Sequence, residues 1–294
     1  MAAETIKKGT KFPAEIVSDL FSKVKGKSSL AVLAEQEPAA FVGNDFFTFA
    51  MDDEVNIVGE SGAHGAGSTK VEPVKMRPVK IEYGSRVSEE FMQASEEQQM
   101  EILKEFNEGF AKKCARGLDI MAMHGLNPRT DTTSELVTQH FDKGTKTVDF
   151  AAGTGHDNIE AAVELLGDND VTGMAMSKAM SADLAKLETK NGAKLYPELA
   201  WGGQPATLNG VPTSINSTVS FGAATKDMAI IGDFANFFKW GFAKEVSMEI
   251  IPYGDPDNTG KDLKGQGEVY IRAQAYIGWA ILDLDAFARV VKTA

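Results

Sequence analysis

The sequence contains a single cysteine, Cys114, among its 294 residues. One cysteine excludes a disulfide framework and a zinc site built on cysteine pairs, so we expect a chain that is kept in a reducing cytoplasm. Long apolar runs are also missing, and none approaches the roughly 18 residues that a membrane-spanning helix needs. The first eight residues lack the apolar core of a signal peptide. Secreted disulfide scaffolds and helical membrane proteins are therefore not expected.

Positive charge is scarce as well. The chain has 30 Lys and Arg residues against 42 Asp and Glu residues, which gives a formal net charge of −12. This balance argues against a function that depends on tight binding of nucleic acid, because proteins with such a function need a dense basic patch. Hydrophobic residues make up 43% and charged residues 24%, which are ordinary values for a globular protein. The length predicts about two structural units.

Motifs for metal or phosphate binding are incomplete. Asp255–Gly260 begins like a calcium-binding loop, but Thr259 and Gln266 stand where that loop requires other ligands. The segment from Gly254 to Lys261 has the wrong glycine spacing for a phosphate loop. A hairpin loop explains this segment better, and we predict neither a metal site nor a cofactor.

Catalytic motifs are missing too. The four histidines form no metal-binding pair, and surface loop histidines are the favoured interpretation: His64, His124, His140 and His156. Cys114 lies in an apolar helical stripe, which indicates a buried thiol rather than a nucleophile. Asp283 and Asp285 fit a solvated strand end. No catalytic residue is predicted.

The N-terminal part of the chain predicts two projections. Helical spacing of apolar residues from Ile16 to Val24 predicts a short helix in an arm that docks elsewhere. Alternation predicts a strand at 47–57, followed by a glycine-rich tip at 59–68 and a second strand at 70–83. Because Pro73 and Pro78 interrupt it and its apolar phase slips, the second strand should be kinked or at an edge. A lone two-stranded ribbon is marginally stable in water, so we expect its partner surface on another subunit.

The rest of the chain has stronger signals. Ser95 begins a capping-box pattern, and apolar residues then recur every three or four positions up to His124, which predicts a long helix. Helix, strand and helix signals at 157–166, 171–177 and 179–190 predict a compact α/β unit, with a tight turn at Asn209–Gly210. Two long alternating strands follow, around 240–250 and 269–281, and flank the loop from Pro252 to Gly267.

Five short motifs, in this order, resemble the major capsid proteins of tailed bacteriophages, which have the Hong Kong 97-type fold. They are Ile57–Gly62, Val79–Phe91, Leu208–Pro212, Ile230–Phe234, and Val269–Ala273 with Gly278–Ala280 and Asp285–Phe287. The resemblance implies an α+β fold with an N-terminal arm (1–46), an extended loop or E-loop (47–83), and a P domain with the spine helix (84–150). An A domain (151–232) and a P-domain return hairpin with the C-terminus (233–294) complete it.

The resemblance also implies a function. The chain would self-assemble into hexamers and pentamers of an icosahedral or prolate shell that encloses double-stranded DNA without sequence-specific binding. It would be made in the host cytoplasm and located in the virion. Residues considered for assembly contacts are Glu60, Lys70, Lys75, Arg77, Arg86 and Phe21. No motif marks Lys70 or Lys75 for covalent cross-linking, which some members of the family use.

Partners other than itself also follow from the resemblance: scaffold, portal and decoration proteins. The family's founding members carry a scaffolding segment before the arm, whereas here the arm starts near Met1. We therefore expect a separate scaffold protein, a segment already removed, or neither.

Three alternatives stay open at this point. An encapsulin-type bacterial compartment would share the fold but hold protein cargo. The second alternative is a small-molecule enzyme of the α/β class, which would have to turn over a substrate although no catalytic site is recognisable in the sequence. A monomeric binding module would leave the ribbon at 47–83 without support.

Overall fold

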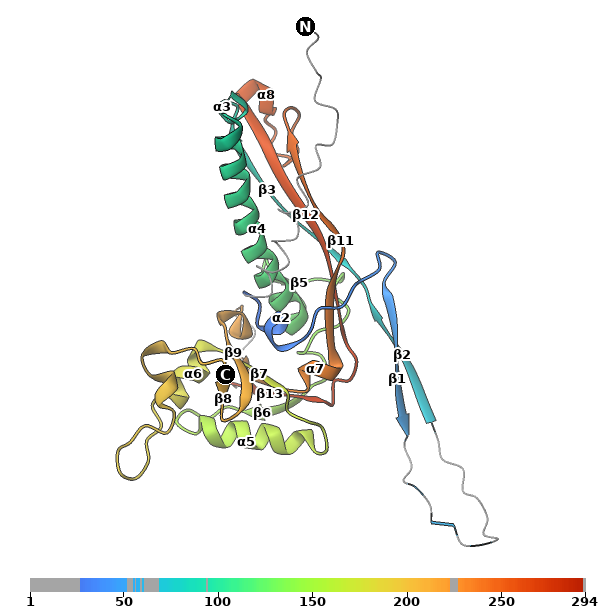
Figure 1. Ribbon diagram of the computed structural model, residues 1–294, viewed down its shortest axis with the longest axis vertical. Helices are drawn as coiled ribbons and strands as arrows, with labels where there is room; N and C mark the ends of the chain where they lie inside the picture. The colour runs from blue at the N-terminus through green and yellow to red at the C-terminus, as the bar shows by residue number, and fades with distance from the viewer. Residues whose placement is uncertain are drawn as a thin grey trace.

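The structure is a computed structural model, which describes residues 27–51, 55, 57–58, 60, 69–93, 95–222 and 227–292. It is elongated, with a long helix and sheet at one end, a second sheet at the other, and a ribbon that projects to one side (Figure 1). The predicted helix at 16–24 lies outside the described residues. Within the described part of the chain, no helix is long and apolar enough to cross a membrane.

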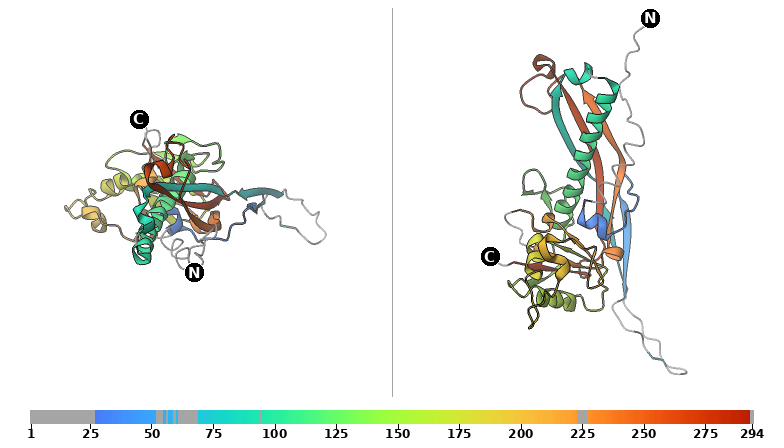
Figure 2. Two further views of the ribbon diagram at one scale, coloured as in Figure 1. Left: turned by 90° about the horizontal axis from the view of Figure 1, so that it is seen from above. Right: turned by 60° about the vertical axis from the view of Figure 1, so that its left-hand side comes forward.

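The long sheet is three-stranded and antiparallel, in the order β11 (Phe238–Ile251), β12 (Glu268–Ile281) and β3 (Val79–Ser88). Alternate residues of β12 are buried from Val269 to Ile277, as the predicted alternation requires. The buried face packs against the long helix α4 (Glu96–His124), which Figure 2 shows running along the sheet. The short helices α3 (Glu90–Gln93) and α8 (Leu263–Gln266) lie near the far end of this sheet.

Helix α4 confirms the predicted spine. Ser95 is its N-cap, and the Ser95 hydroxyl accepts a hydrogen bond from the Gln98 backbone N–H at 3.4 Å. Gly125 ends it in the left-handed conformation with φ 68°. The predicted apolar stripe is buried at Leu103, Phe110, Cys114, Leu118 and Met121, while Phe106 packs at its margin. Burial raises the pKa of the Cys114 thiol, which agrees with the predicted unreactive side chain.

The second sheet has six strands, in the order β6 (Lys146–Asp149), β13 (Phe287–Val291), β10 (Asp227–Gly232), β7 (Gly173–Met176), β9 (Val211–Ile215) and β8 (Thr207–Leu208). Its central strand β10 is completely buried. Helices α5 (Gly155–Leu166) and α6 (Lys178–Leu184) pack against it, and α7 (Phe234–Phe237) leads out to β11. Two short 3₁₀ helices, η1 (Pro197–Gly202) and η2 (Ser217–Ser220), belong to the same region.

Several predictions about this region need correction. The first helix begins at Gly155, two residues before the predicted start at Asp157. The second ends at Leu184 rather than at Lys190, because the chain after it turns back and Glu188 pairs with Lys194. The turn at Asn209–Gly210 is confirmed, with both residues at positive φ. The sheet also contains β6 and β13, which lie before and well after residues 151–232 in the sequence.

The ribbon consists of β1 (Asn44–Met51) and β2 (Thr69–Met76), paired antiparallel from Asn44↔Met76 to Met51↔Thr69. The strand predicted at 47–57 therefore begins earlier and ends at Met51, and Val55 and Ile57 are exposed outside it. The single strand predicted at 70–83 is two strands. It breaks at Arg77–Pro78, where the chain leaves the ribbon and joins the long sheet as β3, and this change of sheet explains the slip in apolar phase.

Two further small elements complete the described chain. Helix α2 (Ser29–Leu33) packs against α4, and the following residues cross β11 on their way to the ribbon. A two-stranded turn, β4 (Leu126–Asn127) and β5 (Thr132–Thr133), follows α4 directly. The predicted α+β class is confirmed.

Candidate functional site

The ribbon exposes two large apolar side chains. The Phe47 side chain is 70% exposed and the Val71 side chain 51% exposed. Near the root of the ribbon, Lys75 Nζ lies 3.4 Å from Asp45 Oδ1, and both side chains are about half exposed. Such a surface can bury apolar area only against another molecule or another part of the assembly.

The residues predicted for assembly contacts are not gathered in one place. Glu60 lies in an exposed turn, Lys70 lies in β2, and Arg77 is exposed between β2 and β3. Phe21 lies outside the described residues. Arg86 lies near the C-terminal end of β3, opposite Tyr270 of β12, and is engaged within its own chain.

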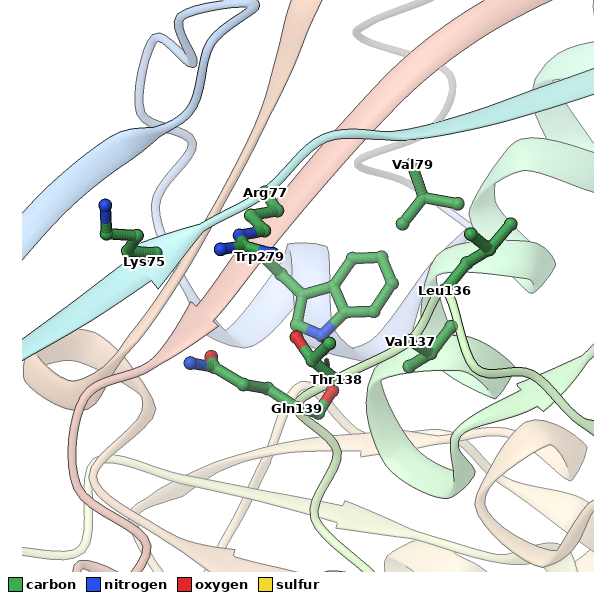
Figure 3. Close-up of a pocket in the computed structure, with 8 residues that line it drawn as sticks. All are labelled: Lys75, Arg77, Val79, Leu136, Val137, Thr138, Gln139 and Trp279. Carbon is green, nitrogen blue, oxygen red and sulfur yellow. Dashed lines mark hydrogen bonds between the residues drawn. The ribbon is translucent and has the colours of Figure 1, made fainter.

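A small pocket lies beside the root of the ribbon (Figure 3). Lys75 and Arg77 reach it from one side, and Leu136, Val137, Thr138 and Gln139 line the other, with Trp279 between them. The Trp279 indole donates a hydrogen bond to the backbone carbonyl of Gln139 at 2.9 Å, which fixes the ring. Arg77 and Leu136 are exposed here, so the pocket is an open surface feature rather than an enclosed reaction chamber.

Arg86 holds the loop between β11 and β12. Its guanidinium donates to Asp257 Oδ2 at 2.9 Å, to Asp255 Oδ1 at 2.9 Å and to Glu268 Oε2 at 3.1 Å. It also donates to the Thr259 hydroxyl at 2.6 Å. The Arg86 side chain is only 16% exposed, so these bonds form in a partly shielded place.

This arrangement explains the calcium-like spacing of Asp255 and Asp257. Both carboxylates face Arg86, which supplies the positive charge that a metal ion would supply in a calcium-binding loop. The hydrogen bond from Arg86 lowers the pKa of the Asp257 carboxyl to about 2. The preference for a hairpin loop over a metal site agrees with these contacts.

Asp119 is a buried acceptor that the sequence analysis did not identify. It is completely buried on α4 and accepts hydrogen bonds from the backbone N–H groups of Ser29, at 3.0 Å, and Leu30, at 3.2 Å. The hydroxyl groups of Ser28 and Thr218 also donate to it. Burial raises the pKa of Asp119, against the opposite effect of these hydrogen bonds. The sequence does contain a signal for this buried carboxylate, because Asp119 is an acidic residue within the most apolar turns of α4.

A second buried cluster lies where α4 meets the six-stranded sheet, and it corrects the expectation of surface histidines. His124 is buried, and its Nε2 lies 2.9 Å from the Thr218 carbonyl oxygen while its Nδ1 lies 3.1 Å from Asp142 Oδ2. Because both partners are acceptors, both ring nitrogens must carry protons. Burial acts to lower the pKa of His124, but the hydrogen bond and charge of Asp142 outweigh it and raise the pKa.

Arg289 of β13 completes this cluster. Its Nη1 donates to Asp142 Oδ1 at 2.7 Å and to Asp227 Oδ1 at 2.9 Å. His124, Asp142 and Asp227 together offer metal-ligand atoms within 4.8 Å of one another. However, the guanidinium already lies against both carboxylates, so the contacts favour a structural ion cluster over a metal site.

One exposed aromatic residue stands out near the six-stranded sheet. Trp201 of η1 is completely exposed and has φ 60°, a left-handed conformation that bulky residues seldom adopt. Two neighbours anchor its loop, since Tyr196 and Leu199 are buried in the core of this sheet. A large apolar side chain held outward at a conformational cost is typical of a contact surface.

Comparisons with known proteins agree with this fold. The family model described as the phage capsid family matches residues 9–292. No curated protein matches the chain. The chain therefore belongs to the phage capsid family.

Solved structures give the same result. A chain from Mycobacterium phage Ogopogo is 29% identical, with a TM-score of 0.79 over 91% of this chain and 92% of that one. A chain from Gordonia phage Cozz is 22% identical, with a TM-score of 0.72 over 100% and 90%. A chain from the capsid of a native GTA particle computed with C5 symmetry is 15% identical, with a TM-score of 0.62 over 100% and 95%.

The predicted family and the Hong Kong 97-type fold are confirmed. The protein is a structural major capsid protein of the virion shell that associates with copies of itself. The encapsulin alternative is not favoured, because the family model and the structural relatives are those of phage capsids.

Proposed function

We propose that the chain forms hexamers and pentamers of a closed icosahedral or prolate shell around double-stranded DNA, and that it does no catalysis. The observation that carries this proposal is the ribbon β1–β2, which projects from the body of the subunit and whose strands pair only with each other along the described residues. A two-stranded ribbon with exposed Phe47 and Val71 is stable only when another surface covers it.

Trp201, in η1 near the six-stranded sheet, supports the same proposal. Contacts between proteins are enriched in Trp, which removes much apolar surface from water at little entropic cost. The ribbon and Trp201 belong to different elements of the subunit, as expected for a head-to-tail interface that closes into a ring. On the ribbon side of this interface, the residues that we propose to contact a neighbouring subunit are Glu60, Lys70, Lys75 and Arg77.

The acidic net charge is consistent with an inner shell surface that does not bind the phosphates of the packaged DNA. A net charge of −12 per subunit repels DNA at long range, so packaged DNA would slide rather than adhere. Scaffold, portal and decoration proteins are the further partners that we propose. Synthesis would take place in the host cytoplasm, before the shell forms.

Electron microscopy and analytical ultracentrifugation of the purified chain test this function. We expect rings or closed shells that grow with protein concentration. A sharp monomer of about 32 kDa at every concentration, with the ribbon resistant to protease, would contradict self-assembly. As a control for the ribbon, Glu60–Thr69 can be replaced by Asn-Gly, and we expect a folded subunit that forms few shells.

A further inference from the structure

The pairing of β1 with β2 gives the ribbon two chemically different faces. Phe47 lies opposite Pro73, and Val71 lies two positions before Pro73 on β2, so these three residues share one face. We call the face that carries Phe47, Val71 and Pro73 the apolar ribbon face. Thr48 and Glu72 lie opposite each other on the second face, because successive residues of a strand point to opposite sides.

The second face is the one that the subunit uses for its own fold. At the root of the ribbon, Met76 is completely buried, and its side chain packs against Gly278 of β12. Phe46 and Val74, which lie opposite each other on this face, are half-buried. Further out the face becomes polar, where the Thr48 hydroxyl donates to the Glu72 carbonyl oxygen at 3.2 Å.

Among the residues that the structure describes, none covers the apolar ribbon face in this way. Phe47 and Val71 stay 70% and 51% exposed, and Pro73 is exposed beside them. The left view of Figure 2 shows the ribbon directed away from the two sheets. The Asp45–Lys75 ion pair borders the face on the root side, as polar residues border the apolar centre of a protein interface.

We propose that the apolar ribbon face is buried against a second copy of this chain in the assembled particle, while the Thr48–Glu72 face stays accessible. The inference rests on the proposed function and adds which side of the ribbon makes the contact. A second copy is the occupant, because the family membership shows self-association and the ribbon reaches beyond its own subunit.

Cysteine labelling tests the two faces without blocking assembly. Phe47→Cys and Thr48→Cys are adjacent in β1 but lie on opposite faces, and the native Cys114 is buried and does not compete. Unassembled subunits of both variants should react quickly with a charged thiol reagent. In particles made from the chain alone, we expect at least tenfold slower labelling of Phe47→Cys and nearly unchanged labelling of Thr48→Cys.

A charge substitution gives an independent readout. Phe47→Asp should leave circular dichroism and the melting temperature of the subunit near those of the wild type, since the ribbon lies outside both cores, but should reduce particle yield at least tenfold. Thr48→Asp carries the same new charge on the other face and should assemble close to normally.

The outcomes separate this inference from the proposed function. If the wild-type chain forms no oligomer, both fail. If it assembles but the two cysteine variants label equally in particles, or Phe47→Asp assembles as well as Thr48→Asp, the inference about the face is wrong and the proposed function stands. A preference for labelling Phe47→Cys in particles would show that the opposite face is the buried one.

Discussion

A Cβ atom placed on Gly241 would lie 1.8 Å from the backbone carbonyl oxygen of Glu37. The segment that leads from α2 to the ribbon crosses β11 at this point, where the Glu37 N–H donates to the Trp240 carbonyl oxygen at 2.8 Å. Only glycine allows the two backbones to approach so closely. The crossing fixes the direction in which the ribbon leaves the body of the subunit.

We expect Gly241→Ala to lower the free energy of unfolding by about 1–3 kcal/mol, because the added methyl group forces the crossing segment away. Gly109→Ala is the matched control. No atom lies within 4 Å of its added Cβ, and Ala is a better helix former than Gly by about 1 kcal/mol. Chemical denaturation of the unassembled subunit measures both, and the expected changes have opposite signs.

Removal of the Asp119 carboxylate should release α2 from α4. Asp119→Ala leaves the Ser29 and Leu30 N–H groups and the Thr218 hydroxyl without their acceptor, and we expect a loss of about 3 kcal/mol or more. Asp119→Asn keeps one acceptor oxygen and should lose less. Limited proteolysis should cut the alanine variant near α2 first, and equal cleavage of both variants would contradict the assignment.

Loss of the Arg86 side chain should free the loop from Pro252 to Gly267. Arg86→Met removes the donors that hold Asp255 and Asp257, so we expect faster proteolytic cleavage of this loop with the two cores intact. The control is Arg272→Met in β12, because Arg272 pairs only with the exposed Glu249 among the ion pairs of the described chain. Equal cleavage of both variants would show that the loop is held by other contacts.

The contact between Arg86 and Asp257 also predicts that the stability of the folded chain decreases in acid. Asp257 has a pKa of about 2 in the folded chain, below its unfolded value, so its contribution to stability is present above about pH 4. The contribution is lost as the pH falls from about 4 towards 2. Arg86→Met should remove this part of the acid dependence in denaturation curves measured across that range.

For the buried cluster around Arg289, we expect the stability of the folded chain to depend on pH in the opposite direction, in a higher pH range. Burial raises the pKa of Asp227 to about 7, and the pKa of His124 is raised as well, so the folded chain holds more protons here than the unfolded chain. Stability should therefore fall as the pH rises from about 4 through 7, by up to about 1.4 kcal/mol per pH unit for each extra proton.

Two variants test which groups are responsible. Asp227→Asn removes one titrating group and should flatten the curve between pH 4 and 7. His124→Gln keeps a donor for the Thr218 carbonyl oxygen but cannot be charged, so it should be less stable at pH 6 and less dependent on pH above it. Unchanged slopes in both variants would show that other groups control the titration.

Weak binding to DNA follows from the acidic charge. At physiological salt the unassembled subunit should bind duplex DNA with a Kd of about 10⁻⁴–10⁻⁶ M or weaker, measured by fluorescence anisotropy. A nanomolar Kd with a steep dependence on salt would contradict the proposed non-adhesive lining and would reveal a basic face.

The parts that sequence analysis predicts well are those in which local signals agree with the fold. Ser95 and Gly125 limit α4 as their capping chemistry requires, and the alternation in β12 matches a strand with one buried face. Asn209–Gly210 forms its turn because these residues adopt positive φ readily. In each of these elements the conformation depends on residues only a few positions apart.

The parts that it misses depend on contacts between distant segments. The slip in apolar phase near Pro78 predicts a kink but not a change of sheet, because the new partner of β3 is the distant strand β12. His124 lies in a buried cluster with Asp142, Asp227 and Arg289, which come from three separate segments of the sequence. Likewise, the carboxylates of the 255–257 loop acquire a role only once Arg86 is known to lie against them.

The position of β13 has a consequence for how the protein is made. This strand lies between β6 and β10, yet the ribosome makes it after every other strand of the six-stranded sheet. The sheet therefore stays open during translation, with β10 lacking a neighbour and Asp227 lacking its Arg289 partner. A nascent chain cannot complete this part of the subunit until residues 287–291 have left the exit tunnel. Until then the unpaired edge of β10 is exposed, which makes the incomplete chain prone to aggregation.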